Sequence, residues 1–391
     1  MMNSMPEPIY LDHNATTPIL PEVVEAMRAC WAEPYLNPAS QHIFGRAARR
    51  KLEDARDRVA ELLGAASPDR VIFTSGGTEA NNLAIRGLLQ RAGSVSARIP
   101  NLLISAIEHP SITTLTDHLS QTGHSIDRLG VDANGVIRID DLNEKLLADT
   151  RLVAAMLANN ETGVIQPITE LATICNALHI PLHVDASQAA GKLPLIFRDL
   201  GASTLTVAAH KFGGPLGIGA LIVRHDVTLQ PQLFGGFQQG GLRPGTESVA
   251  LAVGLSTALE LWNSHRRKWS SQLQKLRDHF ESLLRDAPLK NCRIQIIGTA
   301  ASRLPNTSNI AFVGLDRQQL FLALDQAGVA CSTGSACASG SSEPSPVHIA
   351  MGLEPDVISS ALRFSFGIST TPAEVEESTR RIINVCNSLR R

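Results

Sequence analysis

The sequence has few aromatic residues and no excess of charge of either sign. Phenylalanine, tryptophan and tyrosine make up 4% of the 391 residues, which argues against a surface that stacks nucleic-acid bases or sugars on aromatic rings. Lysine and arginine number 35 and aspartate and glutamate 37, so the formal net charge is −2. Binding a nucleic-acid backbone needs a basic face, and this balance therefore excludes nucleic acid as an expected partner.

Long apolar runs, a signal segment and paired cysteines are also missing. The longest apolar runs, such as 219–223, fall far short of the roughly 20 residues of a membrane-spanning helix, so no membrane partner is expected. The N-terminus lacks a basic stretch followed by an apolar one, and the six cysteines include no C-x-x-C pair. We therefore predict a cytoplasmic protein with free thiols.

No metal site is expected either. His179 and His183 are four residues apart, but Pro181 between them favours a strand. Four residues along a strand span about 13 Å, which is too far for one metal ion.

Alternating strand and helix patterns fill the first two thirds of the chain. Hydrophobic residues make up 43% of the sequence, which suits a large core. At about 150 residues per domain, a chain of this length is expected to form two domains. Short strands separated by helices predict an α/β fold with a mostly parallel sheet covered on both faces. We predict strands at 71–74, 102–105, 152–157, 181–184, 205–207 and 219–223, and helices at 44–63, 79–89, 111–121, 140–148 and 168–179.

From about residue 265 the pattern changes to that of a smaller α+β domain. A long helix pattern ends before Pro288. We predict a large domain over 18–264 and a small one from 1–17 and 265–391. The small domain is expected to hold strands at 293–297, 310–313 and 363–366 and helices at 318–327 and 372–389.

Three polar features lie where active sites form in such sheets, at the carboxyl ends of strands. The segment 75–79 (SGGTE) precedes a helix and is either a phosphate cradle or a plain turn. Asp185 follows a strand and is either a helix cap or a partner for a ligand cation. Lys211 follows the next strand among glycines, where partial burial would lower its pKa from about 10.4 and make it nucleophilic.

Together these features fit one cofactor. Pyridoxal phosphate needs a lysine for its aldehyde, a carboxylate for its pyridinium nitrogen and a cradle for its phosphate. His109, just past the strand 102–105, is either a satisfied loop residue or a ring that lies over the cofactor and moves protons.

Two cysteines lie in the segment CSTGSACASG (331–340). Cys337 stands among small residues with nothing to pack against, which favours a reactive thiol. With a pKa of about 8.5, only about 3% of such a thiol is ionised at pH 7, so it needs a nearby cation or proton acceptor. Cys331 ends an apolar run and is predicted to face the core.

The chain resembles the cysteine desulfurases, in the group whose longer active-site loop (about 331–346 here) feeds iron–sulfur cluster assembly. The resemblance covers nearly the whole chain in one order of motifs. It implies a fold-type-I pyridoxal-phosphate enzyme that acts as a homodimer and converts L-cysteine to L-alanine and an enzyme-bound persulfide. The matching segments are LDHNATTP (11–18), NPAS (37–40), FTSGGTEANNLAI (73–85), EHPSI (108–112), NNETGVIQPI (159–168), HVDASQAAGKLP (183–194), AHKFGGPLGIGAL (209–221), RPGTES (243–248), STGSACASGSSEPS (332–345) and LRFSFG (362–367).

The resemblance also implies a role for each matching residue around the cofactor ring. Lys211 would hold the cofactor as a Schiff base and later abstract the substrate proton. Asp185 would pair with the pyridinium nitrogen, and Gln188 would bond the ring hydroxyl. His109 would stack on the ring and shuttle protons.

The remaining roles concern the phosphate, the substrate and the sulfur. Cys337 would attack the substrate sulfur and pass it to an acceptor protein. The other implied ligands are, for the phosphate, Gly77, Thr78, His210 and, from a second subunit, Thr246, and, for the substrate, Asn14, Asn160 (also beside the cofactor) and Arg363.

Three features depart from the family pattern. Ala208 stands where a serine commonly touches the phosphate, so one hydrogen bond is expected to be missing. Cys331 stands where many relatives have an apolar residue. The sequence ends at Arg391, without the longer tail that some relatives use to dock a scaffold, so the sulfur acceptor stays open.

Two alternative functions also stay open. One is a selenocysteine or cystine lyase on the same fold, which substrate comparison would separate. The other is a catalytically silent sulfur carrier or scaffold protein, which would show no visible cofactor band.

Overall fold

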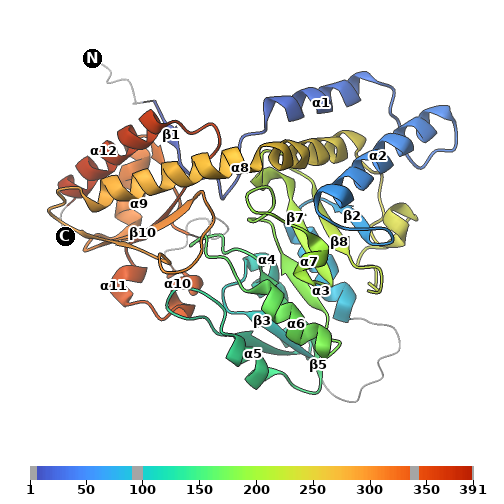
Figure 1. Cartoon of the computed structure of the whole chain (residues 1–391), viewed down its shortest axis with the longest axis horizontal. Coiled ribbons are helices and arrows are strands. Elements are labelled where there is room, and N and C mark those ends of the chain that lie inside the picture. The colour runs from blue at the N-terminus through green and yellow to red at the C-terminus, as the bar shows by residue number, and fades with distance from the viewer. Residues whose placement is uncertain (1–6, 90–99, 335–342, 390–391) are drawn as a thin grey trace.

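A seven-stranded sheet forms the centre of the larger part of the molecule (Figure 1). The structure, a computed structural model, describes residues 7–89, 100–334 and 343–389. The strand order is β2-β8-β7-β6-β5-β3-β4. Neighbouring strands from β7 to β4 run parallel, whereas β8 is antiparallel to both β7 and β2. The strands are β2 (Arg70–Thr74), β3 (Asn101–Ser105), β4 (Ser125–Leu129), β5 (Thr150–Met156), β6 (Leu182–Asp185), β7 (Thr204–Ala208) and β8 (Gly219–Val223).

Helices cover both faces of this sheet. Successive side chains of a strand point to opposite faces, and in β3 Leu102 and Ile104 pack into one hydrophobic cluster while Leu103 packs into the other. The predicted mostly parallel α/β architecture is confirmed. The helices around the sheet are α1 (Pro21–Ala32), α2 (Ile43–Leu62), α3 (Gly77–Leu89), α4 (Pro110–Gln121), α5 (Ile139–Lys145), α6 (Ile168–Ala177) and α7 (Phe197–Leu200), with 3₁₀ turns at Ala209–Lys211 and Gln238–Gly241.

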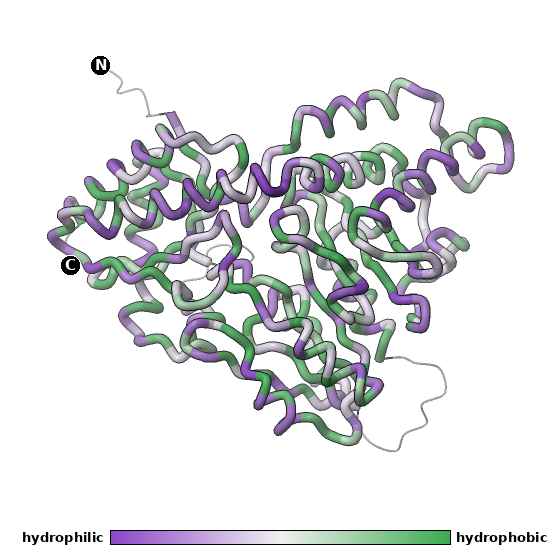
Figure 2. Tube along the Cα trace, in the orientation of Figure 1, coloured by the Kyte–Doolittle hydropathy of each residue, from purple (hydrophilic) through white to green (hydrophobic). Residues whose placement is uncertain are grey.

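The second region is built on a smaller, antiparallel sheet of order β12-β10-β9. Phe280, Phe312, Phe364 and Phe366 pack edge to face or tilted at its core. Hydrophilic and hydrophobic residues alternate along α12, as on a helix with one buried face (Figure 2). The elements are β1 (Ile9–Tyr10), β9 (Arg293–Ile296), β10 (Thr307–Val313), α9 (Arg317–Gln326), β11 (Val329–Ala330), α10 (Pro346–Ala350), α11 (Pro355–Ile358), β12 (Ala361–Ser365) and α12 (Pro372–Ser388).

One helix, α8 (Val249–Arg285), runs through both regions (Figure 1). It has 37 residues and contacts α1 and α2 in one region and α12 in the other. It begins at Val249, whereas the sequence pattern indicated a start near residue 265. The earlier part was missed because it is buried on most sides and therefore lacks the spacing of an amphipathic helix. The boundary proposed at 264/265 lies inside this helix.

The other predicted elements lie close to their predicted ranges, but helix α1 and the short elements β1, α7, β11, α10 and α11 were not predicted. The edge strand β4 was not predicted, because its sequence SIDRL mixes charged and apolar residues and is largely exposed or half-buried. Within the described residues, no helix has the length and apolarity needed to cross a membrane. His183 lies in β6, and the described ranges hold no metal-binding group of three or more His, Cys, Asp or Glu side chains.

Candidate active site

A cavity of about 260 Å³ lies at the carboxyl ends of β6 and β7, as expected for an α/β sheet. Of the predicted site residues that the structure describes, only Thr246 is absent from its lining. Residues far apart in the sequence therefore meet around one hollow. The predicted residues on its wall are Asn14, Gly77, Thr78, His109, Asn160, Asp185, Gln188, His210, Lys211 and Arg363.

Lys211 stands one turn beyond β7, in the 3₁₀ turn Ala209–Lys211. Its Nζ donates to the carbonyl oxygens of Asn14 at 2.7 Å and Ala15 at 2.9 Å. These bonds hold the amine at the cavity wall, where it could reach a ligand aldehyde.

Asp185 ends β6 and is 7% exposed. Its Oδ1 accepts from the Ser187 N–H at 2.9 Å, and its Oδ2 accepts from Asn81 Nδ2 at 2.8 Å. The carboxylate is therefore fixed at the cavity wall, where it can pair with a protonated ring nitrogen.

The first residues of α3 also line the cavity. The N-terminus of a helix offers free N–H groups to an anion, and Gly77 begins this one. A Cβ on Gly77 would come within 3.0 Å of Ser187 Oγ and 3.4 Å of Ala208 Cβ, so glycine keeps this corner open. Ser187, which the sequence analysis did not select, places a hydroxyl at the same corner as the methyl group of Ala208.

His210 lies on the same wall and bonds Thr16 Oγ1 through Nδ1 at 3.2 Å. Burial, and then the nearby Lys211 and Lys192, lower its pKa to about 4. His210 is therefore a neutral hydrogen-bonding group at ordinary pH.

His109 caps the N-terminus of α4, where its Nδ1 accepts from the Ser111 N–H at 3.1 Å. Burial lowers the pKa of His109, and the Asp185 carboxylate partly opposes that shift. Its ring belongs to the lining of the cavity, as does the end of β6.

Gln188 is held from both sides. Its Nε2 donates to Asn14 O at 2.9 Å, and Lys192 Nζ donates to its backbone oxygen at 3.1 Å and to its Oε1 at 3.3 Å. Lys192 is a second residue that the sequence analysis missed. Burial, with smaller effects of Lys211 and Arg363, lowers its pKa to about 7, so the amine is only partly charged near neutral pH.

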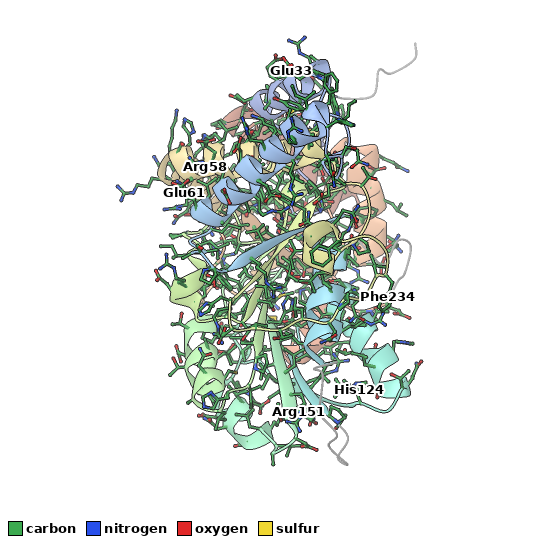
Figure 3. The ribbon with its side chains drawn as sticks, turned by 90° about the vertical axis from the view of Figure 1, so that its right-hand side faces the viewer. Glu33, Arg58, Glu61, His124, Arg151 and Phe234 are labelled. Atoms are coloured by element: carbon green, nitrogen blue, oxygen red, sulfur yellow. The ribbon has the colours of Figure 1, made fainter. Side chains whose placement is uncertain are left out.

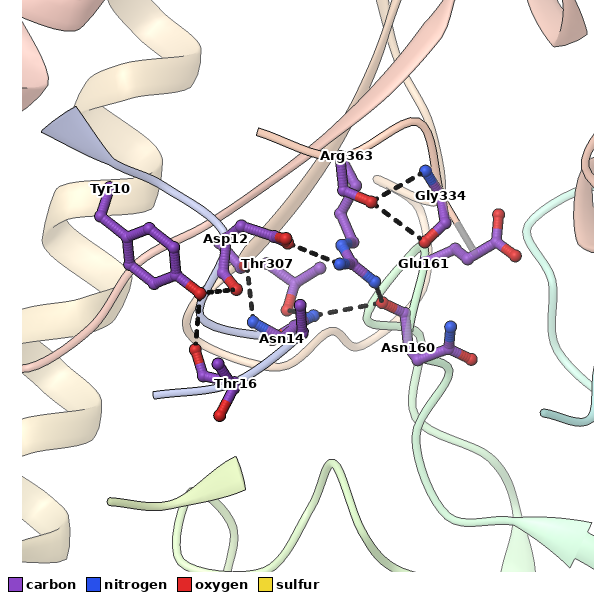
Figure 4. Close-up of polar contacts among 12 residues, drawn as sticks. Tyr10, Asp12, Asn14, Thr16, Asn160, Glu161, Thr307, Gly334 and Arg363 are labelled. Carbon is purple, nitrogen blue, oxygen red and sulfur yellow. Dashed lines mark hydrogen bonds and ion pairs between the residues drawn. The ribbon is translucent and has the colours of Figure 1, made fainter. Parts of the chain in front are cut away.

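Arg363 comes from β12, in the small sheet, and is 1% exposed (Figure 4). Its Nη1 donates to Asn160 O at 3.0 Å, and its Nη2 donates to Asp12 Oδ1 at 2.6 Å. Among the described residues, its Nε has no hydrogen-bond partner. These two bonds use two of the five guanidinium N–H donors, and the buried Nε–H is among the remaining ones, which suits a carboxylate ligand.

Asn14 joins the two regions through its side chain and its backbone. Its Nδ2 donates to Asn160 O at 3.2 Å and to Thr307 Oγ1 at 2.9 Å (Figure 4). Its own carbonyl accepts from Lys211 Nζ. Both amide hydrogens of the side chain are therefore engaged inside the protein.

Two residues named in the sequence analysis and described by the structure, Thr246 and Cys331, are not part of the cavity lining. Thr246 is exposed and lines a separate hollow with Arg243. Cys337 lies outside the described residues. Cys331 is 7% exposed and burial raises the pKa of its thiol, so the prediction that it faces the core is confirmed.

Comparisons with known proteins agree over nearly the whole chain. Residues 9–377 match the aminotransferase class-V family. A curated relative named cysteine desulfurase IscS, from Dictyoglomus turgidum, is 38% identical over 386 residues, which cover 99% of this chain and 96% of the relative.

Solved structures show the same likeness. A NifS-like protein is 30% identical with a TM-score of 0.89, and the match covers 98% of this chain and all of that one. SspA in complex with cysteine is 30% identical with a TM-score of 0.79, covering 92% of this chain and 98% of that one. The resemblance seen in the sequence motifs is confirmed: the chain belongs to the cysteine desulfurases, within the aminotransferase class-V family.

Proposed function

We propose that this cysteine desulfurase holds pyridoxal phosphate in the cavity at the ends of β6 and β7 and removes sulfur from L-cysteine there. The observation that carries the proposal is the convergence of Lys211, Asp185 and the N-terminus of α3 on one hollow. An amine, a fixed carboxylate and a helix N-terminus with an open glycine corner match the aldehyde, ring nitrogen and phosphate of this cofactor. The residues present therefore fit the group.

The residues on the sheet side would hold and orient the cofactor. Lys211 would bind its aldehyde and later carry the proton from the substrate Cα, and Asp185 would keep its ring nitrogen protonated. Gln188 would bond the ring hydroxyl, and His109 would lie over the ring and take part in proton transfer. When bound, the cofactor withdraws electrons from the substrate Cα and so makes that proton acidic.

The phosphate would lie in the corner formed by Gly77, Thr78 and His210, and Ser187 is proposed as an additional donor. The hydroxyl of Ser187 lies close to the place where Ala208 offers only a methyl group. Ser187 would thus supply a hydrogen bond that Ala208 cannot make.

The substrate carboxylate would bind to Arg363, with Asn14 and Asn160 shaping the site around it. We propose Cys337, on sequence grounds, as the nucleophile that attacks the substrate sulfur. The thiolate forms an S–S bond while the substrate C–S bond breaks, and the substrate carbon gains a proton. The products are L-alanine and a persulfide on Cys337, so atoms and electrons balance.

We also propose that the chain works as a homodimer in which Thr246 completes the phosphate site of the partner. Leu233, Phe234 and Phe237, in the segment before Thr246, are 50%, 88% and 85% exposed. Phe234 lies on the face turned to the viewer in Figure 3. Large apolar side chains exposed together favour association with another protein surface.

The sulfur acceptor is proposed to be a protein of the cytoplasm. The matching long-loop motifs make an iron–sulfur scaffold protein the first acceptor to test. An acceptor thiol would attack the outer sulfur of the persulfide and release the Cys337 thiol.

The test uses the purified protein and L-cysteine. We expect a visible absorption band of the bound cofactor, one L-alanine for each sulfur removed, and extra sulfur on the Cys337 peptide by mass spectrometry. Cys331→Ser is the matched control and should retain both turnover and labelling of Cys337. A protein without the band, or sulfur found on Cys331 with Cys337→Ser still active, would contradict the proposal.

A further inference from the structure

A network of buried polar side chains begins at the cavity wall and continues behind it, outside the roles proposed above. It consists of Asn81 from α3, Ser111 from α4, His183 from β6 and Thr204 from β7. These residues are all less than 9% exposed. The network ends on Asp185 at one place and on His109 at another.

Asn81 is the branch point of this network. Its Nδ2 donates to Asp185 Oδ2 at 2.8 Å and to Ser111 Oγ at 2.9 Å. Its Oδ1 lies 3.0 Å from His183 Nε2. A carboxylate only accepts hydrogen bonds, so the NH₂ end of the amide must face Asp185 and the oxygen must face His183.

This orientation fixes the direction of the bonds behind Asp185. Because Asn81 Oδ1 accepts, His183 must carry a proton on Nε2. Its Nδ1, 2.8 Å from Thr204 Oγ1, then accepts from the threonine hydroxyl if the ring is neutral. Burial lowers the pKa of His183 to about 4, which keeps the ring neutral near pH 7.

The other branch fixes the ring of His109. Ser111 Oγ receives one N–H from Asn81, so its own hydrogen is free to point to His109 Nδ1, 3.0 Å away. The same Nδ1 accepts from the Ser111 backbone N–H at 3.1 Å. Two donors therefore face Nδ1, and a proton on that nitrogen would be opposed by both.

We propose that Asn81 is a positioning residue that couples Asp185 to His109 and holds His109 as a neutral imidazole with its proton on Nε2. One side-chain amide thus orients both the acid assigned to the cofactor ring nitrogen and the histidine assigned to the cofactor face. His109 then acts as a hydrogen-bond donor through Nε2, and the base in the reaction is Lys211. This refines the roles in the proposed function and rests on it, but the hydrogen bonds themselves can be tested separately.

The experiment measures histidine tautomers in the purified full-length protein labelled with ¹⁵N-histidine. Long-range ¹H–¹⁵N spectra distinguish Nδ1–H, Nε2–H and charged rings, and His109→Gln and His183→Gln assign the two signals. We expect both rings to be neutral with the proton on Nε2 at pH 7. A His109 ring that is charged, or protonated on Nδ1, would overturn the proposal.

Two variants separate the branches of the network. Asn81→Ala should shift the ring ¹⁵N signals of both histidines, whereas Ser111→Ala should shift those of His109 and leave His183 as in the wild type. Asn101→Ala is the matched control, because Asn101, at the start of β3, is another fully buried asparagine, and its hydrogen bonds go to Ser125, Asp127 and Thr150 instead.

Unchanged His109 signals in both Asn81→Ala and Ser111→Ala would refute the coupling. Ser111→Ala keeps the helix cap and tests the His109 branch if Asn81→Ala does not fold. Loss of the visible cofactor band in the wild type would instead count against the proposed function, so the two failures are distinguishable. The expected spectroscopic effect on the holoenzyme is a changed pH midpoint of the visible band in Asn81→Ala, with no change in Asn101→Ala.

Discussion

The two sides of the cavity are built in different ways. On the sheet side, Lys211 and Asp185 lie at the ends of neighbouring parallel strands, and their hydrogen bonds go to uncharged amides and carbonyls. On the arginine side, Arg363 comes from the small sheet and forms a salt bridge with Asp12, 351 positions away in the chain. Lys211 and Asp185 therefore each have uncharged hydrogen-bond partners, whereas Arg363 is already paired with the Asp12 carboxylate.

This difference affects what a ligand must do on each side. A cofactor entering the sheet side meets donors and acceptors already held in place, which is the arrangement that costs least to bind. A substrate carboxylate on the arginine side must share a guanidinium that Asp12 also holds. We therefore expect the sheet side to govern cofactor retention and the arginine side to govern the apparent affinity for cysteine.

The largest effect is expected from Lys211→Ala. Removing the amine leaves no group to bind the aldehyde, so covalent attachment of the cofactor and essentially all turnover should be lost. Borohydride reduction followed by mass spectrometry measures the attachment. Lys192→Ala is the informative comparison, because this buried amine also lies nearby. A Lys211→Ala protein that still carries reducible, covalently bound cofactor would show that another lysine holds it.

Arg363→Ala should act on the other side alone. Losing one partner of a buried charge pair typically costs about 2–5 kcal/mol, so KM for cysteine should rise by well over tenfold while the cofactor band stays intact. Arg303→Ala is the matched control, because Arg303 is 8% exposed at its side chain and pairs with Glu281 in the same region. If KM rises equally in both variants, Arg363 has a structural role, and the arginine side does not specifically govern the affinity for cysteine.

The buried carboxyl group of Glu108, close to the sheet side of the cavity, should make the stability of the fold depend on pH. Burial raises its pKa to about 8, while its Oε1 accepts from the Met156 N–H at 2.7 Å. In the unfolded chain its pKa is about 4.3. The folded state thus keeps a proton that the unfolded state loses between these values.

The stability that this proton contributes is present below about pH 4.3 and is lost as pH rises through about 8. Glu108→Gln, which stays neutral, should therefore show a smaller fall in the free energy of unfolding between pH 5 and 8 than the wild type. Denaturant titrations at several pH values measure this. If the free energy of unfolding depends on pH in the same way in the two proteins, Glu108 is ionised in the folded state.

The smallest effect is expected from Ser187→Ala. One lost hydrogen bond is worth about 1 kcal/mol, so the affinity of the cofactor-free protein for pyridoxal phosphate should fall roughly fivefold. Ala208→Ser in the same protein should restore the affinity by supplying a hydroxyl at the adjacent position. Titration by absorbance measures both. Unchanged affinity in Ser187→Ala would remove Ser187 from the proposed phosphate site.

The sequence predicted regular, well-patterned parts of the fold and missed those without a pattern. Helix α2 was predicted within a residue of its observed start and end, because its apolar positions recur every three or four residues. The first half of α8 was missed because small and apolar residues surround it, and β4 because its side chains mix polar and apolar types.

The candidate site divides in the same way. Asp185 and Lys211 could be found because each directly follows an apolar strand. Asn81, Ser187 and Lys192 could not, because an asparagine, a serine or a buried lysine acquires its partner only when distant segments meet. Asn81 and Asp185, for example, are 104 positions apart.

The long helix α8 makes the geometry of the cavity depend on a count of residues. A helix of 37 residues is about 56 Å long, and each residue adds about 1.5 Å and turns the chain by about 100°. One residue inserted midway along α8 would rotate its far half, and a flexible loop could absorb such a change whereas a packed helix cannot. A surface loop can therefore change in length without consequence for the site, whereas the distance between Lys211 and Arg363 depends on the number of residues in α8.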